Sequence, residues 1–267
     1  MRLPNALEIA IARRYLRGSR RGRGMALNTA IATGGVAVGV MALIVVLGIM
    51  NGLRDDLTDR ILIANPHLRV LTFGPSLRFE PWRGALDTVL AEPGVVAASP
   101  EVITQSVARN RAGYVSAVNI IGLPTDTGLA SVTTIPQAIT QGDLQFRTTS
   151  DSVDGGIILG YRLAERMSLY QGDLVELVSS ASARVNPALG TVVPKFWRFE
   201  VVGRFDTGMF QYDDAFAIMS LERAQAFDGL GEAITGIQIQ VTDPWLAPAI
   251  GKRLEGKLGY PYRTLDW

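Results

Sequence analysis

The residues that most often perform catalysis are few and poorly grouped in this sequence. The chain has one histidine, His67, and no cysteine, which excludes HExxH sites, multi-histidine metal sites, thiolate catalysis and disulfides. We interpret the adjacent carboxylates at Asp55–Asp56 and Asp213–Asp214 as solvated charge rather than as acid–base pairs. There is no GxSxG elbow, no GxGxxG after a strand and no GxxxxGK[ST] phosphate loop. The sequence therefore predicts no catalytic residue, metal site or cofactor, and any ATP hydrolysis belongs to another chain.

The most prominent element of the sequence is a long apolar segment near the N-terminus. Residues Met25–Met50 include no charged side chain. As a helix rising about 1.5 Å per residue, this stretch reaches about 39 Å, more than the roughly 30 Å hydrocarbon core of a bilayer. We predict one transmembrane helix over residues 25–50 and a stalk helix over residues 51–64 that ends at Asn65–Pro66. A buried helix of a soluble protein is the alternative.

Charge is distributed unequally about this segment. Residues 1–24 contain seven arginines and one acidic residue, Glu8, a net charge of +6. Because the whole chain has 26 basic and 25 acidic residues, residues 51–267 carry 19 basic and 24 acidic ones, or −5. Short flanks rich in arginine stay in the cytoplasm. We therefore predict a cytoplasmic, amphipathic basic segment over residues 1–24 and an exported domain over residues 65–267. A cleaved signal peptide is the alternative, but its apolar region would be unusually long.

The predicted membrane helix has two distinct faces. Small residues at positions i, i+3, i+7 and i+10, which include a GxxxG, allow a second helix to approach closely. We predict that this helix-packing face consists of Ala32, Gly35, Gly39 and Ala42. The opposite side is bulkier, and we predict that it faces lipid or an acyl substrate through Leu43, Val46, Leu47 and Met50.

The exported part alternates between strand and helix patterns, which is typical of an α+β domain. Residues 101–108 and 114–122 read as a hairpin, and further strands are predicted at 173–179, 197–202 and 234–241. Residues 124–154 have little periodicity and are predicted to connect two parts of the domain. The fold class is therefore α+β, with one N-terminal transmembrane helix and a large domain of two lobes.

Several stretches of the sequence follow, in the same order, the motifs of one transporter family. They are VMALIVVLGIMNGLRDDLTDRILIANPHLRV (Val40–Val70), GIILGYRLAERMSLYQGDLVELVS (Gly156–Ser179), FEVVGRFDTGMFQYDDAFAIMSLERAQ (Phe199–Gln225), and a tail with ITGIQIQVTDPW and YRTLDW. Together they cover nearly the whole chain. On these residues the chain resembles the LolC/LolE-type permeases, membrane subunits of the lipoprotein-releasing ABC transporter with a MacB/FtsX-like periplasmic core domain.

The resemblance implies a location and a set of partners. The chain would lie in the bacterial inner membrane, with its N-terminus cytoplasmic and its two-lobed domain periplasmic. Its helix would contact lipoprotein acyl chains and membrane lipid. The implied partners are a LolD-type ATPase subunit, a second LolC/LolE-type permease subunit, a LolA-type periplasmic carrier and the lipoprotein substrate, and no nucleic acid. The chain itself would not be an enzyme.

The resemblance also implies a protruding hairpin, the hook, that captures the carrier. The matching segment is residues 180–199, with a hook-like loop over residues 184–195 whose apolar tip is typical of a partner site. The predicted carrier-binding residues are Val185, Pro187, Leu189, Gly190, Val192, Val193, Pro194, Lys195 and Arg198. A flexible hairpin without a partner is the alternative.

Other functions stay open at this point. The family has four membrane helices, and this chain ends at Trp267, where the second helix is expected to begin. We therefore expect only the N-terminal part of a permease, either as a fragment or as a chain completed by another. The alternatives are a MacB/FtsX-type efflux or cell-division permease and a single-pass periplasmic scaffold or binding protein.

Overall fold

The computed structural model describes residues 6–17, 23–73, 78–125, 132, 135–185 and 192–266. The chain divides into two compact units, Met1–Leu57 and Thr58–Trp267.

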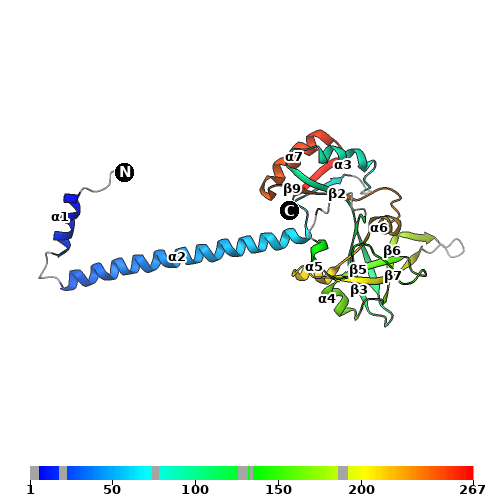
Figure 1. The fold of residues 1–267 in the computed structure, drawn as a ribbon, viewed down its shortest axis with the longest axis horizontal. Coiled ribbons are helices and arrows are strands. Elements are labelled where there is room, and N and C mark those ends of the chain that lie inside the picture. The colour runs from blue at the N-terminus through cyan, green and yellow to red at the C-terminus, as the bar shows by residue number, and fades with distance from the viewer. Residues whose placement is uncertain are drawn as a thin grey trace. The chain divides into compact units, whose positions relative to one another are not determined.

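The first unit consists of α1 (Ala6–Arg17) and most of α2 (Arg23–Ala64). Because α2 is one continuous helix of 42 residues (Figure 1), the predicted transmembrane and stalk helices are a single element. The part long and apolar enough to cross a membrane is Leu27–Arg54, with a mean hydropathy of 2.5 and no burial inside the protein. The helix ends just before Asn65–Pro66, because a proline disfavours helical conformation at the preceding residue.

The second unit contains a ten-stranded sheet within its described residues, and six of these strands close into a barrel. Each barrel strand pairs with the next, and the last pairs with the first, so the ring has no free edge. In ring order the strands are β2 (Val95–Arg109), β3 (Val115–Leu123), β8 (Phe216–Ser220), β5 (Gly155–Gly160), β7 (Val192–Phe205) and β6 (Leu174–Val185). A short strand, β4 (Ile139–Gln141), pairs with β7 outside the ring.

The remaining strands extend the sheet from the first half of β2. Their order is β10 (Tyr262–Asp266), β1 (Leu68–Thr72), β9 (Gly236–Val241) and then β2. Two helices, α3 (Trp82–Leu90) and α7 (Ala247–Leu258), lie side by side on this part (Figure 1) and bury apolar side chains in the same core. Five short elements complete the described part of the fold: α4 (Tyr161–Arg166), α5 (Phe210–Ala215), α6 (Leu221–Phe227) and the 3₁₀ turns Ile135–Ala138 and Pro244–Leu246.

Neighbouring residues in the barrel strands are buried on opposite faces, as the period of two along a strand requires. The main core cluster contains Ile120, Ile157 and Ala217, whereas Ile121, Ile158 and Ile218 belong to a second cluster. The second cluster also holds Ile135 and Phe146. Ile135 and Phe146, two described residues of the predicted connecting segment, therefore help to cover one face of the barrel. Because the main cluster also includes residues of α3 and α7, one core serves both parts of the sheet, and the division into two lobes stays a prediction.

The buried side chain of Glu101 forms hydrogen bonds at the place where β2 stops pairing with β9 and begins to pair with β3. The Glu101 side chain is fully buried and accepts hydrogen bonds from Arg69 Nε on β1, at 2.9 Å, and from Gln238 on β9. Thr235 N donates to Glu101 O at 3.0 Å, and Thr235 Oγ1 accepts from Ile103 N at 2.7 Å. Burial raises the pKa of Glu101, and Arg69 opposes this rise. Hydrogen bonds of Glu101 thus link β1, β2 and β9 at the boundary between the open part of the sheet and the barrel.

Candidate functional site

His67 and Asp213, two of the ionisable residues considered in the sequence, have structural partners. His67 Nδ1 lies 3.1 Å from Val241 O and 3.2 Å from Val241 N, and burial lowers the pKa of this histidine. Asp213 accepts hydrogen bonds of 2.8 Å from both Thr207 N and Thr207 Oγ1. The prediction of solvated charge is therefore wrong for Asp213, which is buried and holds the backbone at Thr207 through these two hydrogen bonds. No group of three or more metal-ligating side chains occurs among the residues that the structure describes.

The hairpin of β6 and β7 occupies the segment that the sequence assigns to the hook, and its strands are longer than predicted. Pairing runs from Leu174↔Glu200, past an irregularity after Ser179, to Val185↔Val192. The prediction of a loop over residues 184–195 is therefore wrong for residues 184–185 and 192–195, which are strand. The cause is the valine content of these positions, since β-branched residues favour extended backbone.

The structure places only part of the predicted carrier-binding set. On the strands lie Val185, Val192, Val193, Pro194, Lys195 and Arg198. Pro194, Lys195 and Arg198 are exposed. Pro187, Leu189 and Gly190 fall outside the described residues. The binding role of the whole set stays a prediction.

The base of the hairpin is fixed to the barrel core by aromatic contacts. The Lys195 ammonium lies 3.5 Å from the centroid of the Trp197 ring, a cation–π contact. The buried Trp197 ring packs 6.5 Å from Phe199 and 5.9 Å from Phe227 of α6. Ser179 Oγ donates to Phe227 O at 2.6 Å. Lys195 is therefore already engaged, and pairing with an acid of a partner would have to compete with Trp197.

An exposed apolar row crosses four barrel strands, including both strands of the hairpin, and the sequence patterns did not predict it. We call this the apolar row; its cross-strand partners are Ala117, Val107, Val178 and Phe196, on β3, β2, β6 and β7. Val107 is 42% exposed and Phe196 49% exposed. A shallow cavity of about 520 Å³ adjoins the row and is lined in part by Val107, Ala117 and Val178. Because Phe196 follows Pro194 and Lys195 on β7, this face is continuous with the hairpin.

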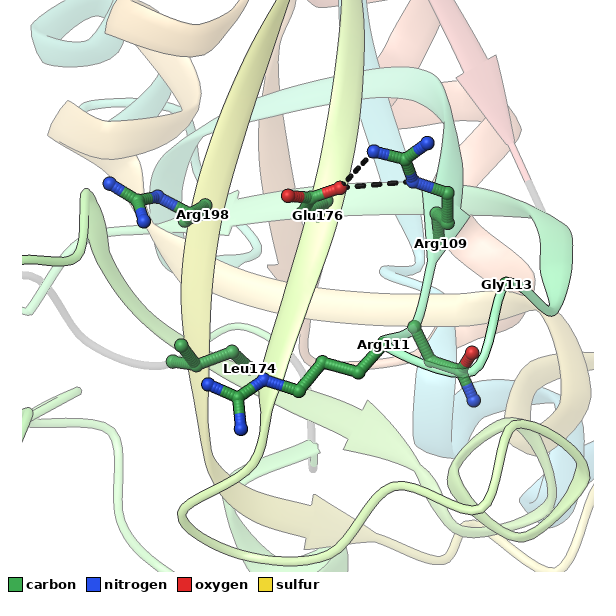
Figure 2. A pocket seen from close by; sticks show the side chains of 7 residues that line it. Arg109, Arg111, Gly113, Leu174, Glu176 and Arg198 are labelled. Carbon is green, nitrogen blue, oxygen red and sulfur yellow. Dashed lines mark hydrogen bonds and ion pairs between the residues drawn. The ribbon is translucent and has the colours of Figure 1, made fainter.

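A charged row borders the apolar row on the same side of the sheet. Arg109, Glu176 and Arg198 are cross-strand partners on β2, β6 and β7 (Figure 2). Arg109 Nε donates to Glu176 Oε2 at 2.9 Å, and its guanidinium lies 5.3 Å from the Phe196 ring centroid. Apolar residues bordered by arginines are typical of protein–protein interfaces. The hairpin and these two rows together form the candidate site.

The residues of both predicted faces of the membrane helix are exposed along α2, but the two sets do not lie on opposite sides of it, because Val46 and Met50 follow Gly35 and Gly39 by eleven residues, or about three full turns. Each of their residues lies between Leu27 and Arg54 and is exposed. A Cβ atom added at Gly35 or Gly39 would meet no atom within 4 Å. The helix therefore offers room for a neighbour along its small-residue face. The packing and acyl-contact roles stay predictions.

Replacing Gly39 with Leu is expected to weaken association of α2 with a neighbouring membrane helix by about tenfold, equal to about 1.4 kcal/mol. The added side chain would force the two backbones apart. The matched control is Gly34→Leu, which also adds its side chain into open space but on the opposite side of the helix. Association is measured by energy transfer between labelled chains in bilayers. Equal losses in both variants would contradict the assignment of the packing face.

Comparison with known proteins shows which family the chain resembles over most of its length. The MacB-like periplasmic core domain matches residues 29–257. The lipoprotein-releasing system transmembrane protein LolC of Neisseria meningitidis serogroup B is 31% identical over 249 residues, which cover 92% of this chain and 57% of that protein. The protein of the same name from Xylella fastidiosa is 27% identical over 266 residues, which cover 98% of this chain and 61% of that protein.

The chain thus spans less than two thirds of the length of these curated relatives. Among solved structures, the periplasmic region of MacB from Actinobacillus actinomycetemcomitans aligns with a TM-score of 0.44 and 11% identity. That alignment covers 77% of this chain and 90% of the other.

Proposed function

This chain belongs to the MacB-like periplasmic core domain family, and from that premise we propose that it is part of an ABC transporter permease that releases lipoproteins from the inner membrane. The observation that carries the proposal is the likeness to LolC proteins over nearly the whole chain. The continuity of the β6–β7 hairpin with an exposed apolar row supports it, because a releasing machine needs a docking surface for its carrier.

The physical cost of the task fits this assignment. Moving an acyl chain into water costs about 0.8 kcal/mol per CH₂ group, so a multiply acylated lipoprotein would cost on the order of tens of kcal/mol to release unaided. The chains must therefore pass from an apolar membrane face to an apolar carrier without exposure to water. In our proposal Leu43, Val46, Leu47 and Met50 contact the acyl chains and the hairpin receives the carrier.

The energy source lies outside this chain in our proposal. Its sequence has no phosphate-binding loop, so a LolD-type ATPase subunit would hydrolyse ATP. A second LolC/LolE-type permease subunit, identical or different, would pack against the face containing Gly35 and Gly39. The chain itself is then a permease subunit and not an enzyme.

We propose a cytoplasmic N-terminus and a periplasmic Thr58–Trp267 unit, because the +6 and −5 charges lie on opposite sides of one apolar helix. A reporter that is active only outside the cytoplasm, fused after Trp267, should be active. Neutral replacements should reduce that activity at Arg13, Arg14, Arg17, Arg20, Arg21 and Arg23. Activity of a reporter that works only in the cytoplasm would reverse the assigned orientation.

Binding of a LolA-type carrier tests the function itself. The full chain in detergent should bind the carrier saturably, and deletion of residues 185–194 should remove the binding. A MacB/FtsX-type efflux or cell-division permease, or a periplasmic scaffold, has no need of such a carrier. Absence of binding by the intact chain would therefore reject lipoprotein release in favour of those alternatives.

A further inference from the structure

A basic pocket lies where the charged row of the candidate site meets the β2–β3 turn. Its volume is about 380 Å³, within the range of small-molecule sites. Three segments form it: the β2–β3 turn, the start of β6 and the middle of β7 (Figure 2). The lining residues are Arg109, Asn110, Arg111, Gly113, Leu174, Glu176 and Arg198.

The charge inside this pocket is not balanced. Arg109 and Glu176 neutralise each other through their ion pair. Among the residues that the structure describes, neither the Arg111 nor the Arg198 guanidinium has a carboxylate within ion-pair distance. The lining residues therefore carry a net charge of +2.

The backbone holds both unpaired arginines in place. Arg111 lies in a turn closed by hydrogen bonds from Asn110 N to Tyr114 O and from Gly113 N to Asn110 O, each 3.1 Å. The Asn110 side chain fastens this turn to the barrel by donating to Met167 O at 2.7 Å. Arg198 N donates to Asp154 Oδ2, also at 2.7 Å. The main-chain positions of the two arginines are thus fixed, and their exposed guanidinium groups can reach a ligand in the pocket.

We propose that this pocket binds a phosphate group, as inorganic phosphate or as a phosphate monoester. A guanidinium matches phosphate oxygens with two parallel N–H donors. A phosphate dianion neutralises the +2 charge, whereas one carboxylate side chain of a protein would leave half of it uncompensated. Leu174 supplies an apolar wall that can accommodate the carbon skeleton of an ester. The proposal goes beyond lipoprotein release and does not depend on it.

Titration of the full chain in detergent with inorganic phosphate and with glycerol 3-phosphate tests the proposal and distinguishes the two sources. Saturable binding is expected by calorimetry, with tighter binding of the ester if Leu174 contacts its carbons. Arg111→Gln and Arg198→Gln should each raise the dissociation constant by about tenfold. The control is Arg147→Gln, an exposed arginine outside the pocket, which should leave it unchanged. Binding of the ester should weaken as pH falls from 7.5 to 5, because the dianion of a phosphate monoester gains a proton near pH 6.

Three results would overturn the proposal. The first is that the intact chain shows no saturable binding of phosphate, and the second is that all variants bind phosphate equally well. The third is that Arg111→Gln and Arg198→Gln weaken carrier binding but leave phosphate binding unchanged. The last result would assign the arginines to protein docking. Circular dichroism of each variant excludes misfolding as the cause of a loss.

Discussion

Replacing Leu189 with Asp is expected to lower the affinity of this chain for a LolA-type carrier by about a hundredfold. In our proposal Leu189 is one of the carrier-binding residues and loses its contact with water when the carrier binds. An unpaired charge in such a contact costs about 3 kcal/mol, and each 1.4 kcal/mol corresponds to a factor of ten. The measurement is calorimetric titration of the full chain in detergent with the carrier.

The matched control for this change is Leu265→Asp on β10. Leu265 is 52% exposed on a strand at the edge of the sheet, so the same substitution there should leave carrier affinity unchanged. Phe196→Ala tests the apolar row separately and should cost about tenfold if the row is part of the contact. Carrier affinity that is the same for Leu189→Asp and the unmodified chain would defeat the hook assignment.

Much of the architecture follows from local patterns in the sequence. An uncharged run of 26 residues, 25–50, predicts an exposed apolar helix, and the structure has one. The predicted strand at 114–122 is β3, Val115–Leu123. The helix is not interrupted between the predicted transmembrane and stalk segments, because residues 51–64 contain no proline and continue the helix.

Long-range pairing could not be predicted in the same way. Alternating apolar residues indicate which face of a strand is buried, but not which strand lies beside it. The pairing of Val107 with Val178 closes the barrel and creates the apolar row. In sequence, Val107 and Phe196 adjoin the buried Ala108 and Trp197, so each reads as part of a continuous apolar run. Exposure of these residues depends on barrel closure, and the candidate site was therefore only partly predictable.

The same limit applies to the buried polar group at Glu101, where the second large effect is expected. Arg69→Met should lower the free energy of unfolding at pH 7.5 by about 3–5 kcal/mol, because it leaves a buried carboxylate without its cation. The measurement is denaturant unfolding of the full chain in detergent, followed by tryptophan fluorescence. The control is Arg83→Met, which breaks an ion pair whose partners are 70% and 87% exposed and should cost at most about 1 kcal/mol.

The pH dependence of Arg69→Met gives an independent test of the cause. Burial already raises the pKa of Glu101 above its ordinary value of 4.5, and loss of Arg69 raises the folded-state pKa further. A raised pKa means that the folded state binds the proton more tightly than the unfolded state, so the penalty for an ionised Glu101 grows as pH rises. The deficit of Arg69→Met relative to the unmodified chain should therefore shrink between pH 7.5 and pH 5. Combining Arg69→Met with Glu101→Leu should recover most of the stability, because no charge then remains buried. A deficit that is independent of pH and persists in the double variant would indicate lost packing by the arginine stem instead of an unpaired carboxylate.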